Sequence, residues 1–378
     1  MKEKLGEQTP DSTFAVFVPY SRDNPYQAEL IKRLAKYGVR VETERDVKNA
    51  FAKIMRRQIR PDVLHLHWIV ISMRSNPVRC LIRTIAFVTR LFILRIKGVR
   101  IVWTVHNLVS HECKRPKLEW FARSITVRLA HSLIVHTESA KANVLAAWHL
   151  RNSKKVSIVP HGNYVEYYPN RVDRKSARAQ LDIPKWEIVM LFVGNIRPYK
   201  GVPELIEAFK KLNSPKARLV IAGKPHNDNI ANEIRAKCGT QKDIRLVFEV
   251  IPDNELQIYM NAADIVVLPY RDILTSGAVI LAMSFGKALI VPAVGCMTDV
   301  LDTRGSILYN SSEQDGLLNG LRQALNANFE EMGRHNLKLA KQLCWDKAAK
   351  DTAILYQKSA NRKSSRSLVI QEPIYKCN

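Results

Sequence analysis

The chain has 378 residues, of which 46% are hydrophobic and 25% are charged, as in an ordinary globular protein that is long for one core. We find no run of about 18 uninterrupted apolar residues and no apolar region near the N-terminus, so we expect neither a transmembrane helix nor a signal peptide. The net charge of +24 attracts nucleic acid, anionic membranes or phosphorylated substrates, but does not choose among them.

The positive charge is unevenly distributed along the chain, and the cysteines are isolated from one another in the sequence. Residues 1–168 carry 29 Lys and Arg against 13 Asp and Glu, and the remaining residues carry 30 against 22, so the first half is the more basic. The six cysteines are scattered singly, without a CxxC pair. This pattern argues against zinc sites and a disulfide framework, and it fits a reducing cytoplasm.

Short β-branched runs alternate with longer helical patterns along most of the chain. The predicted strands are 13–19, 62–67, 99–105, 132–136 and 156–160 in the first half, and 187–194, 217–223, 244–249, 264–269 and 287–292 in the second. Strands separated by helical patterns indicate βαβ units and parallel sheets. We therefore predict an α/β fold with two doubly wound, Rossmann-like parallel-sheet domains that face a cleft, with ligands beyond the carboxyl ends of the strands.

The domain boundaries follow from a polar stretch at 169–186. We predict a first domain over 1–168 and a second over 169–345. Residues 346–378 are expected to form a terminal helix that packs back on the first domain, followed by a loose polar tail.

The predicted strand EIVMLFVG leads into GNIRPYKG, which places Arg197 and Lys200 just before a helix. Two cations at a helix start are unfavourable unless an anion neutralises them, and phosphate suits both side chains. A solvated turn explains this motif equally well. The glycine spacing is not that of a P-loop.

A second motif lies after the strand that ends at Pro269, where Thr275, Ser276 and Gly277 begin an apolar helix. The free N–H groups at a helix start can bind an anion. Taken alone, the motif is more often an ordinary helix cap, because Ser and Thr are favoured there.

Polar residues also follow the strands of the first half. His106, Asn107 and Glu112 come after VRIVWTV, and His161 and Gly162 come after the last strand of the first domain. A histidine in this place can act as a base, a hydrogen-bond donor or a phosphate partner. The glycine would let the backbone approach a ligand closely. No spacing of histidines and carboxylates indicates a metal site.

Five segments carry a resemblance to a known family, and they occur in this order: WTVHNLVSHE, IVPHGNYVEYYPN, FVGNIRPYKGVPELIEAF, VIPDNELQIYMNAADIVVLPYRDILTSGAVILAMSFGKALIVPAVG and a terminal helix with Trp345. Together they resemble the GT-B glycosyltransferases of the large family-four-like group (glycosyltransferase group 1), over about residues 13–357.

The resemblance implies a nucleotide-sugar donor held by the second domain and an acceptor held by the first. Arg197 and Lys200 would neutralise the donor diphosphate, and the backbone of Thr275, Ser276 and Gly277 would cradle it. Fixed cations and N–H groups stabilise the charge that a leaving diphosphate gains, so no metal is needed if they supply this role. No cofactor is expected beyond the UDP- or GDP-linked co-substrate.

The resemblance also implies that His106 lies near the transferred sugar, and it reveals one departure from the family pattern. Retaining members carry two glutamates whose positions fall here at Ile273 and Leu281. Either Asp272 takes one role, or the ribose is held otherwise, or the enzyme is inverting and uses Glu112 or His106 as its base. The sequence leaves retention and inversion open.

The segment 79–97 predicts a basic amphipathic helix. Arg79, Arg83, Arg90 and Lys97 fall within about 40° of one another on a helical projection, and most of the remaining face is apolar. Such a helix can lie on an anionic membrane. A buried crossover helix whose cations reach solvent explains the pattern as well, although enzymes of the resembling family often extend lipid-linked acceptors at the cytoplasmic membrane face.

We therefore expect a metal-independent glycosyltransferase that moves a hexose-type sugar to a lipid-linked or oligosaccharide acceptor in cell-surface polysaccharide synthesis, on the inner face of the cell membrane. The alternatives are a nucleotide-sugar 2-epimerase of the same fold and a catalytically silent relative. A nucleic-acid binder is disfavoured, because no recognisable motif accompanies the charge. The sequence does not name the sugar, the nucleotide base, the linkage or the oligomeric state.

Overall fold

The computed structural model describes residues 12–21, 24–69, 76–110, 113–185, 187–271 and 273–358. These residues form two compact units. Unit 1 comprises the chain up to Gly162 together with the described residues from Cys344 onward, and unit 2 comprises Asn163–Leu343.

Unit 1 is built on a parallel six-stranded sheet with the order β2-β1-β3-β4-β5-β6. Its inner strands are mostly buried apolar runs, as expected for a parallel sheet that is covered on both faces. The strands are β1 (Thr13–Val18), β2 (Val39–Thr43), β3 (Val63–Leu66), β4 (Arg100–Thr104), β5 (Ser132–Val135) and β6 (Val156–Ile158).

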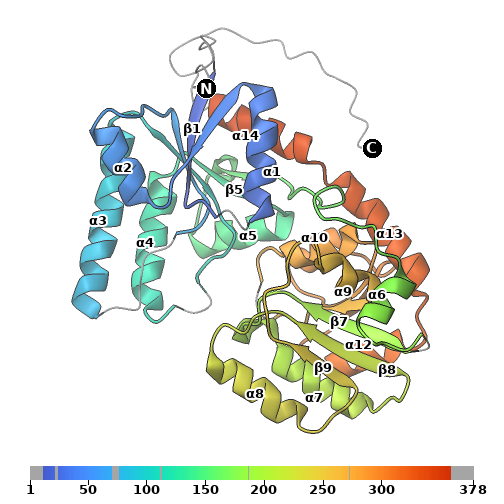
Figure 1. Cartoon of the computed structure of the whole chain (residues 1–378). Helices are drawn as coiled ribbons and strands as arrows, with labels where there is room; N and C mark the ends of the chain where they lie inside the picture. Colours follow the sequence, from blue (N-terminus) through green and yellow to red (C-terminus); the bar gives the residue numbers. More distant parts are fainter. Residues whose placement is uncertain are drawn as a thin grey trace, which may run out of the picture. The chain divides into compact units, whose positions relative to one another are not determined.

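The helices of unit 1 connect these strands, and the last helix returns from the far end of the chain to pack against α1 (Figure 1). They are α1 (Pro25–Leu34), α2 (Val47–Met55), α3 (Pro77–Ile96), α4 (Pro116–Leu129), α5 (Glu138–Ala147) and α14 (Trp345–Lys358), with short 3-10 turns η1 (Ala35–Tyr37) and η2 (Ser153–Lys155).

Unit 2 repeats this plan with a parallel six-stranded sheet in the order β12-β11-β10-β7-β8-β9. Its strands are β7 (Ile188–Val193), β8 (Ala217–Ala222), β9 (Ile244–Val247), β10 (Ile265–Val267), β11 (Ala288–Pro292) and β12 (Ser306–Tyr309). Its helices are α6 (Arg174–Gln180), η3 (Pro198–Lys200), α7 (Val202–Leu212), α8 (Asp228–Cys238), α9 (Leu256–Ala262), α10 (Gly277–Ser284), α11 (Cys296–Val300), α12 (Gly316–Ala324) and α13 (Phe329–Gln342).

The predicted α/β class and the two parallel sheets are confirmed, and each of the ten predicted strands is present. The strands β2 and β12 were not predicted. Both lie at a sheet edge. In β2 only Val39 is buried, whereas β12 is mostly buried but has only four residues, so neither contains the long apolar run that identifies an inner strand. The terminal helical pattern is interrupted at Leu343 and Cys344, between α13 and α14.

Across the described residues, no helix combines the length and the apolar character that a membrane span requires. The longest apolar helix, α3, has 20 residues but is interrupted by four arginines.

Candidate functional site

The loop after β7 holds a partly buried cation, Lys200. Lys200 ends η3, and the αL residue Gly201 then turns the chain into α7. A Cβ on Gly201 would come within 2.1 Å of the carbonyl oxygen of Pro269, so only glycine allows this loop to pack against the end of β10. The contact brings the two predicted motifs of the second domain together at the carboxyl edge of the unit 2 sheet.

Burial, together with the nearby positive charge of Arg197, lowers the pKa of Lys200 to about 8. Its Nζ lies 5.5 Å from the centre of the Tyr270 ring. No carboxylate among the described residues forms an ion pair with this ammonium group. A desolvated cation beside a second cation is costly unless an anion joins them, so this corner of unit 2 is suited to bind one.

The start of α10 completes the corner. Ser276 is the N-cap of this helix, and its hydroxyl accepts a hydrogen bond of 3.2 Å from the N–H of Val279. Tyr270, whose ring lies beside Lys200, follows Pro269 at the end of β10. The hydroxyl of Thr275 is buried without a partner among the described residues. The cap therefore exists, as the simpler interpretation expected, but it leaves a donor and the remaining N–H groups unused.

Gly277 begins α10, and a Cβ added there would lie 3.4 Å from the hydroxyl of Tyr164. The backbone N–H of Tyr164 donates to Ser284 at the other end of the same helix. Neither Tyr164 nor Tyr270 was predicted from the sequence as a site residue. The signal that could have indicated them is their position close to Gly162 and Pro269, within two of the segments that resemble the family.

Ile273 and Leu281 stand at the two positions where the resembling family carries glutamates, and the structure shows the environment of both side chains. Ile273 and Leu281 are partly buried and pack against the hydrophobic core of unit 2. Asp272, the predicted substitute, lies outside the described residues, as does Glu112.

In unit 1, four neighbouring strands each lead into a histidine at the same edge of the sheet. Strands β3, β4, β5 and β6 are followed by residues that surround one ring, that of Tyr26. The centroid distances to this ring are 5.8, 5.3, 5.3 and 4.9 Å for His67, His106, His136 and His161.

Burial lowers the pKa of all four imidazoles. The pKa of His136 falls to about 4 and that of His161 to about 3, while those of His67 and His106 lie well below 6.5. The cluster is therefore neutral near pH 7. A neutral imidazole can donate or accept one hydrogen bond, but it is a weak base and does not attract phosphate as a cation would.

Among the described residues, ring nitrogens without a hydrogen-bond partner belong to His67, His106 and His136, and the resemblance to the family directs attention to His106. Its ring stacks on Trp68, with 4.8 Å between centroids and 18° between planes, and its buried Nε2 has no partner among the described residues. The adjacent Asn107 accepts a hydrogen bond from the Arg123 guanidinium at its carbonyl oxygen. This bond and the buried ion pair of Arg123 with Glu119 fix the loop that follows β4.

The structure gives Gly162 a packing role, while its predicted role in letting the backbone approach a ligand stays a prediction. A Cβ at this position would lie 2.0 Å from Cδ2 of Trp345, so the space on this side of the glycine is filled by an indole of the same unit. His161 is also buried, and its Nδ1 donates to the carbonyl oxygen of Gly162 at 2.7 Å. These two residues support the wall of the histidine cluster.

The sequence left open whether α3 is a membrane-surface helix or a buried crossover helix, and the structure shows features of both. It is a crossover helix whose inner face, including Phe87 and Leu91, is buried. Its outer face is nevertheless apolar. The exposed side chains are those of Val78, Leu81, Ile82, Ile85, Phe92 and Ile96, which we call the α3 stripe. The predicted row of cations runs beside this stripe, since Arg79 and Arg90 lie about 100° and 120° from Val78 on a helical projection.

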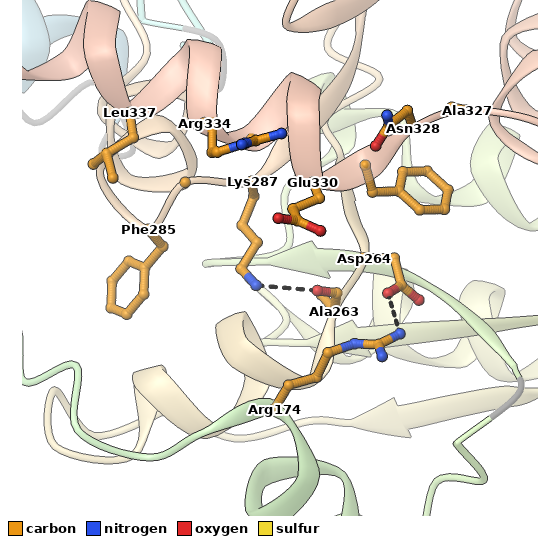
Figure 2. A pocket seen from close by; sticks show the side chains of 13 residues that line it. Arg174, Ala263, Asp264, Phe285, Lys287, Ala327, Asn328, Glu330, Arg334 and Leu337 are labelled. Atoms are coloured by element: carbon orange, nitrogen blue, oxygen red, sulfur yellow. Dashed lines mark hydrogen bonds and ion pairs between the residues drawn. The ribbon is translucent and has the colours of Figure 1, made fainter.

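A further pocket of about 550 Å³ lies at the opposite edge of the unit 2 sheet (Figure 2). Asp264 and Lys287 immediately precede β10 and β11, so the pocket is at the amino ends of these strands. Figure 2 shows Arg174 bonded to Asp264, and Lys287 bonded to the carbonyl oxygen of Ala263. Asp264 also pairs with the buried Arg178. We interpret this arrangement as a stabilising ion network, because ligands of parallel sheets bind at the carboxyl ends.

Comparisons with known proteins identify the fold and the class. Residues 173–342 match the family "Glycosyl transferases group 1". The chain has the GT-B fold and carries a group 1 glycosyltransferase domain. The fold is shared with sucrose-phosphate synthase from Thermosynechococcus elongatus, at a TM-score of 0.72 and 16% identity over 92% of this chain and 99% of that one.

A second structure with the same fold is Anabaena HepE in complex with UDP and glucose, at a TM-score of 0.71 and 15% identity over 92% of this chain and 100% of that one. One relative of this chain in sequence is the GDP-mannose:glycolipid 4-beta-D-mannosyltransferase of Xanthomonas campestris pv. campestris. It is 25% identical over 276 residues, which cover 71% of this chain and 72% of the relative.

Proposed function

We propose that this glycosyltransferase moves a hexose-type sugar from a UDP- or GDP-linked donor to a lipid-linked saccharide acceptor, in the synthesis of a cell-surface polysaccharide. The observation that carries the donor half is the pair of Arg197 and Lys200 at the carboxyl edge of unit 2. The ammonium group of Lys200 is partly buried, forms no ion pair with a carboxylate of the described residues, and lies next to the start of α10.

The donor diphosphate would join the two cations and the unused groups at the start of α10. Charge develops on the leaving diphosphate as the glycosidic bond breaks, and cations that are already fixed stabilise it without reorganisation. Thr275 and Gly277 would contribute a hydroxyl and backbone N–H groups, as at other helix starts that bind phosphate. In this mechanism the chain's own cations perform the charge neutralisation, so we propose a metal-independent reaction.

His106 is proposed to contact the transferred sugar as a neutral imidazole. Its lowered pKa favours hydrogen bonding to a sugar hydroxyl over proton abstraction. A general base for an inverting reaction would then come from another residue, for which Glu112 remains the candidate. Retention or inversion is decided by determining the anomeric configuration of the product.

The acceptor half of the proposal rests on unit 1. The α3 stripe presents apolar side chains to solvent beside a row of cations, which is the arrangement of helices that lie on anionic membranes. The mannosyltransferase relative acts on a glycolipid by its name. We therefore place the protein on the inner face of the cell membrane, as a peripheral protein.

The donor half is tested by calorimetric titration of the full chain with UDP-, GDP- and ADP-sugars, alongside the double variant Arg197→Ala, Lys200→Ala. We expect one nucleotide class to bind and the variant to bind it about 100-fold more weakly, because two charge-assisted hydrogen bonds are lost. The matched control, Lys175→Ala with Lys242→Ala, removes two exposed lysines of unit 2 and should bind like the wild type. Equal affinity in all three proteins would refute the proposed donor site.

A further inference from the structure

Unit 1 contains a pocket that the proposed donor site does not use. It has a volume of about 660 Å³ and lies between α2, α3 and the carboxyl ends of β1 and β3. Its cationic lining comes from Arg45 and Lys48 on the α2 side and from Arg83 and Arg90 on α3. Its apolar lining includes Val18, Val47, Trp68, Ile82 and Phe87.

The charge of the pocket is strongly positive. Four cations line it against a single carboxylate, that of Asp46. This carboxylate is already used as the N-cap of α2, where it accepts a 2.8 Å hydrogen bond from the N–H of Asn49. Among the described residues, no carboxylate forms an ion pair with Arg45, Lys48 or Arg90. The pocket therefore favours an anion that carries more than one negative charge.

Two apolar residues connect the pocket to His106 and to the α3 stripe, both of which have a role in the proposed reaction. Trp68 lines the pocket and also stacks on His106. Ile82 lines the pocket and also belongs to the α3 stripe, with 60% of its surface exposed. A ligand in the pocket would thus lie between the candidate sugar-contacting histidine and the helix face proposed to meet the bilayer.

We propose that this pocket binds the phosphate or diphosphate group of an amphiphile, with its apolar chain leaving along the α3 stripe and its saccharide extending toward His106. The inference rests on the proposed function for the identity of this amphiphile, which is the lipid-linked acceptor. Mixed cationic and apolar lining is what such a ligand requires, since the anion needs charge-assisted hydrogen bonds and the chain needs apolar contact.

The test uses decyl diphosphate as the probe in calorimetric titrations of the full chain. All proteins carry Arg197→Ala and Lys200→Ala, so that the proposed donor site in unit 2 does not bind the probe. The pocket variant adds Arg45→Ala and Lys48→Ala, and the matched control adds Arg56→Ala and Arg60→Ala, two exposed cations outside the pocket. Neither pair belongs to the α3 stripe or to its row of cations.

We expect decyl diphosphate to bind the background protein and the control equally, and the pocket variant at least about tenfold more weakly. Decanol and inorganic diphosphate should each bind at least about tenfold more weakly than the combined probe. Equal binding to the pocket variant, or equal binding of either half of the probe, would overturn the inference. Absence of binding would overturn it as well.

Two further arms sharpen the result. Ala86→Phe fills part of the pocket without changing its charge and should also weaken the probe, whereas an unchanged affinity would place the ligand elsewhere. Dihexanoyl phosphatidylglycerol represents a bilayer headgroup. If it bound as tightly as decyl diphosphate, the pocket would be a site for bulk phospholipid and the acceptor assignment would be wrong.

Failure of this inference and failure of the proposed donor site give different results. If nucleotide sugars bind the wild type through Arg197 and Lys200 but decyl diphosphate fails, only the pocket assignment falls. If decyl diphosphate binds through Arg45 and Lys48 but no nucleotide sugar binds the wild type, the pocket remains a site for phosphorylated amphiphiles and the proposed transferase reaction loses its donor.

Discussion

Raising the pH from 7 to 9 is expected to weaken donor binding, because the proposed diphosphate site depends on the charge of Lys200. Burial and the neighbouring Arg197 lower the pKa of this side chain to about 8 in the free protein. The ammonium form is therefore populated to about 90% at pH 7 and to about 10% at pH 9. A bound diphosphate favours the charged form, so binding selects the protonated protein and its apparent affinity follows the protonated fraction.

The expected loss is about tenfold between these two pH values, equivalent to about 1.4 kcal/mol. The assay is calorimetric titration with the nucleotide sugar that binds best, in buffers at half-unit steps. Lys200→Arg is the matched control, because a guanidinium stays charged throughout this range. Any ionisation of the nucleotide itself affects both proteins equally. The reasoning is refuted if the wild type shows no loss, or if Lys200→Arg shows the same loss.

Three further substitutions test separate parts of the structure. Gly162→Ala should lower the free energy of unfolding by about 3 kcal/mol in chemical denaturation, since its Cβ would overlap the indole of Trp345, and a near-neutral effect would contradict this packing. Asp264→Ala should cost about 3–5 kcal/mol by the same measurement, because it removes the carboxylate that pairs with the buried guanidinium of Arg178 and leaves this charge with backbone carbonyl partners only. Ile85→Asp on the α3 stripe should weaken sedimentation with phosphatidylglycerol vesicles about tenfold, while Val250→Asp, an apolar control in unit 2 that is at least as exposed, should not. If the two substitutions had equal effects, the membrane role of α3 would be wrong.

The fold was predictable because the inner strands of a parallel sheet correspond to uninterrupted apolar runs in the sequence. Phe17 and Phe192, for example, are fully buried within such runs in β1 and β7. The edge strand β2 was missed since Arg40, Glu42 and Thr43 interrupt its pattern. Its pairing with β1 is a tertiary property that a local window does not contain.

The candidate site was predictable only where one loop contained the whole signal. Arg197 and Lys200 are three residues apart, and the change from strand to helix on both sides fixes their place at the edge of the sheet. The histidine cluster is different. Its members His67, His106 and His136 are separated by about 30 to 40 residues, and only the strand order β3-β4-β5 brings them around one tyrosine. Their neutral state follows from that burial, so it was also hidden from the sequence.

Ile273 and Leu281 depart from the family pattern, and the packing of their side chains shows what this departure means for the site. In the resembling family, carboxylates at these positions serve the ribose and the sugar, but here both side chains pack against the core of unit 2. Restoring a glutamate at 281 would therefore add a charge to a partly apolar environment, which disfavours a simple return to the family pattern. The two cations that we propose to bind the diphosphate are retained, so in this proposal donor recognition would depend more on Arg197 and Lys200 than in relatives that also hold the ribose through a carboxylate. This dependence is the reason to expect so large an effect from the charge state of a single lysine.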